Sequence, residues 1–217
     1  MPAAAPDFRQ RFLAFALARD VLRFGDFVTK AGRRTPYFFN AGLFNDGASL
    51  ATLGRFYAEA LMAAGVPFDM LFGPAYKGIT LAASTAIALA QNGHNVPFSF
   101  NRKEAKDHGE GGDIVGAPLA GRVVIVDDVI TDGGAKREAI ERVRAAGATP
   151  VAIMIAFDRK ERGRGALSAV QEITRDFGVP VVAIATLDDL RRFIDTDAAL
   201  AAHAPAIDGY RAQYGVQ

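Results

Sequence analysis

Short apolar runs alternate with amphipathic segments along most of the chain. Runs rich in β-branched and aromatic residues predict buried strands at 68–72, 96–100, 122–126, 151–157 and 179–185. Apolar residues that recur every three to four positions predict helices at 8–19, 46–64, 79–91, 135–146 and 166–177. Because strands and helices alternate, the pattern favours an α/β fold with a doubly wound, mostly parallel five-stranded sheet and right-handed crossovers.

The first 45 residues lack this strand–helix alternation. Residues 21–29 and 37–39 have the pattern of two short strands joined by a turn at 30–33, which predicts a small antiparallel hood. We therefore expect a single domain over residues 1–217, with the hood mainly in residues 1–45. From residue 187 onward, two or three short helices are expected to cover one edge of the sheet.

Composition and charge narrow the function classes. The chain has 217 residues, half of them apolar, and a net charge of +1, so it gives no support for a nucleic-acid or membrane-surface protein. It has no membrane-length apolar run and no secretory signal pattern, and it contains no cysteine. A disulfide framework and a thiolate metal site are thereby excluded, and a cytoplasmic location is expected. The three histidines, His94, His108 and His203, are too widely spaced for a metal motif.

The most informative stretch follows the strand predicted at 122–126. Asp127 and Asp128 stand where that strand leaves the sheet, and a short loop with two glycines then leads into a helix. The N–H groups of Thr131, Gly133 and Gly134 can form an anion-binding nest at the start of this helix. A ligand with a phosphate beside vicinal hydroxyls, such as ribose 5-phosphate, would satisfy both the nest and the acids. Taken singly, either acid is more often a helix cap or a solvated turn residue.

Ligands of such sheets bind at the carboxyl ends of the strands, so the loops there are the candidate sites. One of these loops contains Lys77, and another begins at Asp158. A third is a long insertion at about 101–118, which is charged and glycine-rich. This insertion is either a solvated loop or a mobile loop whose three cations and His108 close over a polyanionic ligand.

The stretch from Val123 to Ala135 resembles the 5-phosphoribosyl 1-diphosphate (PRPP) motif of the type I phosphoribosyltransferases. Together with residues 30–40, 72–78, 100–112 and 158–165, it makes nearly the whole chain similar to the bacterial orotate phosphoribosyltransferase family. The resemblance implies the type I phosphoribosyltransferase fold. It also implies a glycosyltransferase of pyrimidine (UMP) biosynthesis that converts PRPP and orotate into orotidine 5′-monophosphate and diphosphate with Mg²⁺. The family further implies a homodimer in which the mobile loop of one subunit covers the site of the other.

The resemblance also assigns roles to residues by motif. The implied catalytic residues are Lys77, Lys106, His108, Asp127 and Asp128. PRPP would be bound by Lys30, Tyr76, Lys77, Arg102, Lys103, Lys106, His108, Asp127, Asp128, Val129, Ile130, Thr131, Asp132, Gly133, Gly134 and Ala135. Orotate would be bound by Lys30, Phe38, Phe39, Thr131 and Arg159, with the Arg159 guanidinium on its carboxylate. The metal is expected on ligand oxygens and water, with no direct protein ligand.

Several expectations qualify this assignment. The chain has Asp132 and Gly134 where the family often has small uncharged residues, and we expect the Asp132 side chain to point away from the phosphate. The family also suggests a cis peptide bond at Ala75–Tyr76. On the residues alone, Phe38 and Phe39 are more often core residues than a ligand platform. A PRPP-sensing regulator without catalysis, or a transferase for a purine base, would share the fold, but the loop segment 106–108 argues against the regulator.

Overall fold

A computed structural model of the chain describes residues 7–29, 32–106, 112–130, 133–163 and 165–216, with the backbone alone at 104–106 and 112. Its centre is a six-stranded sheet in the order β5–β4–β3–β6–β7–β8. The parallel strands are β3 (Met70–Gly73), β4 (Phe98–Lys106), β6 (Arg122–Val126), β7 (Thr149–Asp158) and β8 (Val181–Thr186). The predicted doubly wound, mostly parallel sheet is therefore confirmed, with one strand more than expected in the described part of the chain.

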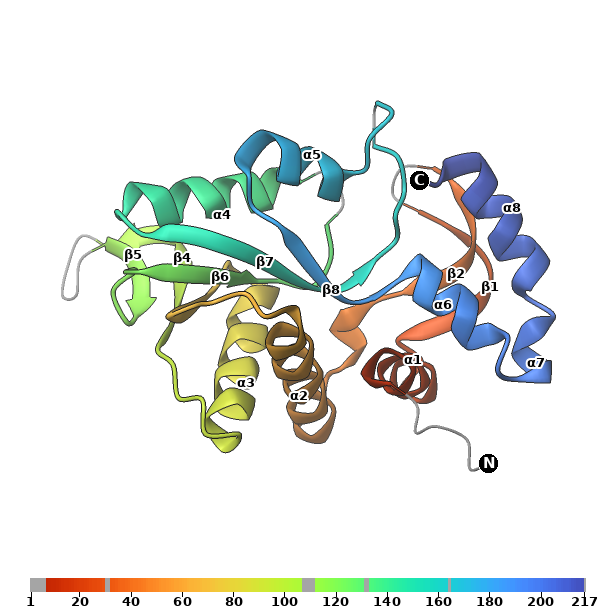
Figure 1. Ribbon diagram of the computed structural model, residues 1–217, viewed down its shortest axis with the longest axis horizontal. Helices are drawn as coiled ribbons and strands as arrows, with labels where there is room; N and C mark the ends of the chain where they lie inside the picture. Colours follow the sequence, from red (N-terminus) through yellow and green to blue (C-terminus); the bar gives the residue numbers. More distant parts are fainter. Residues whose placement is uncertain (1–6, 30–31, 107–111, 131–132, 164, 217) are drawn as a thin grey trace.

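Helices cover both faces of this sheet (Figure 1). One face carries α4 (Gly134–Ala145) and α5 (Ala169–Phe177), and the other carries α2 (Gly47–Ala64) and α3 (Lys77–Gln91). Consecutive residues of β6 point into different cores: Val123 and Ile125 pack with α4, whereas Val124 and Val126 lie in the core that contains α2 and α3. A strand covered on both sides needs apolar residues at every position, and such an unbroken apolar run predicts a buried strand from the sequence.

The additional strand comes from the segment expected to be a long loop. β4 continues to Lys106, and β5 (Gly112–Gly116) pairs with it antiparallel through Phe100 with Val115 and Asn101 with Ile114. Ile114 also packs against the core below α4. Backbone pairing thus orders a charged segment that has few apolar side chains to bury. The tip of the expected loop, 107–111, lies outside the described residues.

The expected antiparallel hood is confirmed as a hairpin of β1 (Leu22–Val28) and β2 (Arg34–Phe39). It is surrounded by α1 (Phe8–Ala18), the short helix η1 (Ala41–Leu43), and the C-terminal helices α6 (Leu187–Ile194), α7 (Ala198–Ala201) and α8 (Ala204–Tyr214) (Figure 1). α6 contacts the edge strand β8, as expected, while α8 packs on β2. The Phe39 ring stacks on Phe157 of β7 at 5.0 Å, so aromatic packing fixes the hood over the carboxyl end of the sheet.

Close backbone packing positions the start of α3 beside the end of β6. A Cβ atom on Gly78 would lie 2.8 Å from the Val126 carbonyl oxygen, and one on Gly73 would lie 2.1 Å from the Gly78 carbonyl oxygen. Neither approach is possible for a larger residue without a shift of the backbone. These two glycines therefore bring Lys77, the first residue of α3, to the end of β6.

Candidate active site

The acidic pair at the end of β6 has its backbone fixed by neighbouring elements. The Asp127 N–H donates to the Met154 carbonyl of β7 at 2.9 Å, and the Ala156 N–H donates to the Asp128 carbonyl at 2.8 Å. From α2, the buried Tyr57 hydroxyl donates to the Asp127 carbonyl at 2.8 Å. Because buried carbonyl and N–H groups are costly to leave unpaired, these bonds hold both acids in one orientation.

Each carboxylate of this pair is matched by a lysine. Asp128 Oδ2 accepts a hydrogen bond from Lys77 Nζ at 2.6 Å, and Asp127 Oδ2 is paired with Lys136 Nζ from the first turn of α4. Asp127 and Asp128 are only 8% and 9% exposed. Burial raises the pKa of Asp127 above its usual range, and the Lys136 charge opposes that rise. The structure thus assembles two nearly buried carboxylates with two cations at one strand end.

Tyr76, Lys77 and Lys103 share the corner next to Asp128. The Ala75–Tyr76 peptide bond is cis, as predicted, and the Ala75 N–H donates to Asn101 Oδ1 at 3.0 Å. The Lys103 ammonium lies 4.8 Å from the centre of the exposed Tyr76 ring. Three of the predicted PRPP-binding residues therefore lie together, at the start of α3 and on β4.

Arg102 supplies a further cation on β4. Its Nη1 atom is buried and has no hydrogen-bond partner among the described atoms. A guanidinium N–H group without a partner can donate a hydrogen bond to an anion, such as a diphosphate oxygen. The other predicted groups of this segment, the Lys106 side chain and His108, lie outside the described residues, so their positions remain predictions.

The predicted phosphate cradle lies at the start of α4. Gly133 is the N-cap residue and adopts the left-handed conformation with φ 79°, which favours glycine, and α4 begins at Gly134. Before it, the Val129 N–H donates to Asp128 Oδ1 at 2.8 Å, which ties the loop to the acidic pair. Thr131 and Asp132 lie outside the described residues, so neither the complete nest nor the predicted direction of Asp132 is tested.

Arg159 lies at the end of β7 in a polar cluster that joins the sheet, the hood and α8. Its Nη2 atom donates to Thr35 Oγ1 at 3.0 Å and to the Tyr210 hydroxyl at 3.3 Å, while its Nε atom donates to Glu161 Oε1 at 2.5 Å. The guanidinium carbon also lies 4.4 Å from the centre of the Tyr37 ring. This side chain is held in a fixed direction, as recognition of a carboxylate requires.

The other predicted orotate residues are less concentrated. Phe39 faces the core, where it packs on Phe12 and Phe157, in agreement with the core reading of this residue. Phe38 is tilted against Phe27 at 5.4 Å. Lys30 lies outside the described residues. The Phe39 ring is thus partly buried against its neighbours, and the backbone of β2 remains a second candidate contact for the base.

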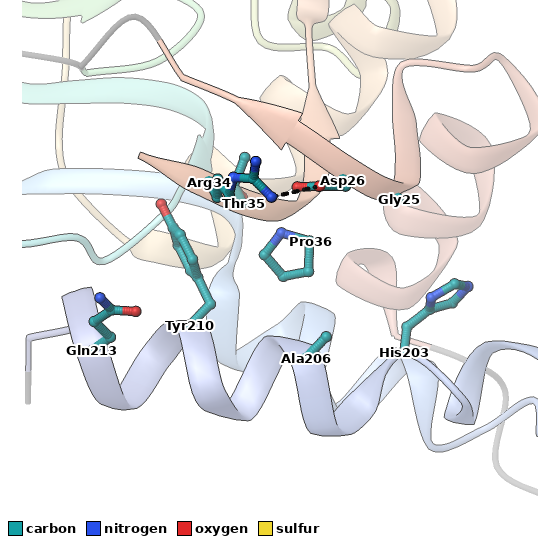
Figure 2. Close-up of a pocket in the computed structure, with 9 residues that line it drawn as sticks. All are labelled: Gly25, Asp26, Arg34, Thr35, Pro36, His203, Ala206, Tyr210 and Gln213. Carbon is teal, nitrogen blue, oxygen red and sulfur yellow. Dashed lines mark hydrogen bonds and ion pairs between the residues drawn. The ribbon is translucent and has the colours of Figure 1, made fainter. Parts of the chain in front are cut away.

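A groove of about 440 Å³ lies between the hairpin β1–β2 and α8 (Figure 2). Thr35 and Tyr210 line it, together with Gly25, Asp26, Arg34, Pro36, His203, Ala206 and Gln213. Arg34 and Asp26 form an ion pair of 3.3 Å on its wall. Neither the acidic pair of β6 nor Arg159 lines this groove, which meets the Arg159 cluster only through Thr35 and Tyr210.

Within the described ranges, no three His, Cys, Asp or Glu side chains gather closely enough to hold a metal ion. In the same ranges, no helix combines the length and hydropathy needed to cross a membrane.

Sequence reasoning missed Lys136, Tyr57, Glu161 and Tyr210. A signal for Lys136 did exist, because it lies three, four and seven residues before Ala139, Ile140 and Val143, which form the buried stripe of α4. A lysine on such a stripe needs a buried anionic partner. The other three residues act across the fold, and no local pattern marks them.

Comparison with known proteins gives a consistent answer over the whole chain. The family model of the phosphoribosyl transferase domain matches residues 42–185. The orotate phosphoribosyltransferase of Chromobacterium violaceum is 63% identical over 210 residues, covering 97% of this chain and 98% of that protein. That of Pseudomonas aeruginosa is 58% identical over 210 residues, with 96% and 99% covered. The crystal structure of the Francisella tularensis orotate phosphoribosyltransferase superposes with a TM-score of 0.85 at 38% identity, covering 94% of this chain and 99% of that one.

Two buried tyrosines provide a matched test of how the acidic pair is anchored. The Tyr57 hydroxyl bonds the Asp127 carbonyl, whereas the equally buried Tyr37 hydroxyl has no partner among the described atoms. Tyr57→Phe should lower the free energy of unfolding by about 1–3 kcal/mol, because a buried carbonyl loses its donor. Tyr37→Phe should leave it unchanged or raise it. Urea denaturation measures both, and equal losses in the two variants would contradict this anchoring.

Proposed function

The chain belongs to the orotate phosphoribosyltransferases of the phosphoribosyltransferase family, and we propose that it transfers the 5-phosphoribosyl group of PRPP to orotate in pyrimidine biosynthesis. The products are orotidine 5′-monophosphate and diphosphate. We further propose that it works in the cytoplasm as a homodimer with Mg²⁺. The acidic pair at the end of β6, beside the N-terminus of α4, is the feature that supports this function most directly.

The roles of the groups follow from the charge that the reaction develops. The bond between the anomeric carbon and the diphosphate oxygen breaks, and a bond from this carbon to an orotate nitrogen forms as that nitrogen loses its proton to water. Positive charge grows on the ribose as diphosphate leaves. The Asp127 and Asp128 carboxylates stabilise this charge and accept hydrogen bonds from the ribose hydroxyls. The N-terminus of α4, over residues 131–135, holds the 5-phosphate. No protein nucleophile is needed.

The departing diphosphate is met by cations. Lys77 of α3 pairs with Asp128, Lys103 of β4 lies over the Tyr76 ring, and Arg102 precedes Lys103 on the same strand. In this proposal, Lys106 and His108 complete the set. Tyr76 and, by the family motif, Lys30 are proposed to contact the same diphosphate. Arg159 holds the orotate carboxylate, and the β2 backbone at Phe38 and Phe39, with Thr131, borders the base.

The donor set suits a magnesium ion that arrives on the substrate. Asp127 and Asp128 are each paired with a lysine, and no three acidic or histidine side chains cluster within the described residues. When bound, Mg²⁺ neutralises the diphosphate oxygens, which are its preferred kind of ligand. No side chain of this chain is assigned as its direct ligand.

A base-selectivity assay tests the proposed function. With PRPP and Mg²⁺, the protein should consume orotate and form orotidine 5′-monophosphate, while adenine in place of orotate should remain unchanged. The loss of orotate absorbance and chromatography of the products measure this. Turnover of adenine but not of orotate would assign a different base. Absence of turnover together with nucleic-acid binding would instead indicate a regulator that retains the fold.

Mixing two inactive variants tests the exchanged loop. Lys106→Ala should slow turnover on the order of 10²–10³-fold, the scale for losing a transition-state charge partner. Asp128→Asn should inactivate the site itself. A dimer with one chain of each kind has one complete site if the loop crosses to the partner, so co-refolding equal amounts should restore about a quarter of the wild-type activity.

The mixed sample also separates the alternatives. No recovery on mixing, when each variant alone is folded and dimeric, would mean that the loop serves its own subunit. A normal rate in Lys106→Ala would show that the loop takes no part in the reaction.

A further inference from the structure

Lys136 is a charged residue at a position where α4 otherwise buries apolar side chains. It is 5% exposed and lies on the stripe that continues through Ala139, Ile140 and Val143. Its ammonium is paired with Asp127 Oδ2. A buried lysine is costly without an anion, so this pairing governs where both side chains can lie.

Lys136 differs from the other lysine of the acidic pair. The Lys77 side chain is 53% exposed, and its ammonium can leave Asp128 to meet a ligand. The Lys136 side chain is only 7% exposed and its ammonium is paired with Asp127, so it acts on a ligand through that carboxylate. The two lysines therefore serve the site in different ways.

We propose that Lys136 is a positioning residue of the phosphoribosyl site, whose ammonium keeps the Asp127 carboxylate ionised and directed at the ribose hydroxyls. This inference rests on the proposed function for the identity of the ligand. It concerns a group outside the PRPP-motif residues assigned above, which end at Ala135.

The surroundings of Asp127 explain why this cation is needed. Its Oδ1 atom accepts the Asp128 N–H at 2.9 Å, and Oδ2 takes Lys136, which leaves lone pairs on both oxygens for ligand hydroxyls. The other titratable groups that face it are the Asp128 carboxylate, which Lys77 of α3 pairs, and the Tyr57 phenol of α2. Burial and Asp128 raise the pKa of Asp127, and Lys136 is the cation that lowers it. Without Lys136, Asp127 would take up a proton at a higher pH.

The test compares Lys136→Met, which keeps most of the unbranched side chain and removes its charge, with the wild type. Arg192→Met is the control, because Arg192 also pairs with a nearly buried carboxylate, Asp189, but lies on α6 away from the acidic pair. Two quantities are measured from pH 5 to pH 9: kcat/KM for PRPP, and the affinity for ribose 5-phosphate by calorimetry. Thermal unfolding shows which variants are folded.

We expect Lys136→Met to move the acidic limb of both pH profiles upward by about one to three pH units, the range for losing an adjacent opposite charge. Activity and affinity should recover toward wild-type values at high pH, where Asp127 ionises without help. Arg192→Met should keep the wild-type profiles. Adding Lys136→Met to Asp127→Asn should cause no further loss, because the lysine acts through that carboxylate.

A loss in Lys136→Met that is equal at every pH would show a purely structural role and overturn the proposal, as would an unshifted acidic limb. If this variant does not fold, Lys136→Gln, which removes the charge and keeps an N–H donor, replaces it under the same criteria. The pH profile of ribose 5-phosphate binding also distinguishes failure of the proposed function from failure of this inference. A wild type that binds ribose 5-phosphate but does not turn over orotate would refute the proposed reaction and leave the role of Lys136 to be decided by the pH shift of binding.

Discussion

The fixed backbone at the end of β6 is the constraint on which the rest of the site depends. Hydrogen bonds with Met154, Ala156 and Tyr57 hold the two peptide units of the acidic pair at the carboxyl end of the sheet, where Asp127 meets Lys136 of α4 and Asp128 meets Lys77 of α3. The strand before them is buried on both faces and cannot shift without disturbing two cores. A site built on such an element keeps its geometry when a ligand binds.

Charge balance is the second requirement that the fold meets. Two nearly buried carboxylates repel each other, which favours protonation of one of them. One lysine from α3 and one from α4 balance these charges. Close packing at Gly73 and Gly78 positions Lys77 beside the acidic pair. Lys136 reaches the pair because it lies on the buried face of α4. The same helices thus complete the core and set the electrostatics of the site.

Local sequence patterns predicted those elements whose structure is determined by residues close together in the chain. The run from Val123 to Val126, the glycines at the start of α4 and the amphipathic helices each carry their own signal, and β6 was placed with its observed bounds. The resemblance to a family added the cis bond at Ala75–Tyr76, which no pattern indicates. Strand β5 was missed because its order comes from pairing with β4 rather than from apolar residues of its own. The cluster around Arg159 joins Thr35, Glu161 and Tyr210 from distant parts of the chain, and such contacts become visible only in the folded molecule.

The most direct measurement is a crystal structure of the protein soaked with ribose 5-phosphate. If backbone amides at the start of α4 and the acidic pair of β6 form one sugar-phosphate site, the phosphate will lie on the N–H groups of residues 131–135, with the ribose hydroxyls on Asp127 and Asp128. Sugar bound elsewhere, with this turn empty or closed on itself, would contradict the account.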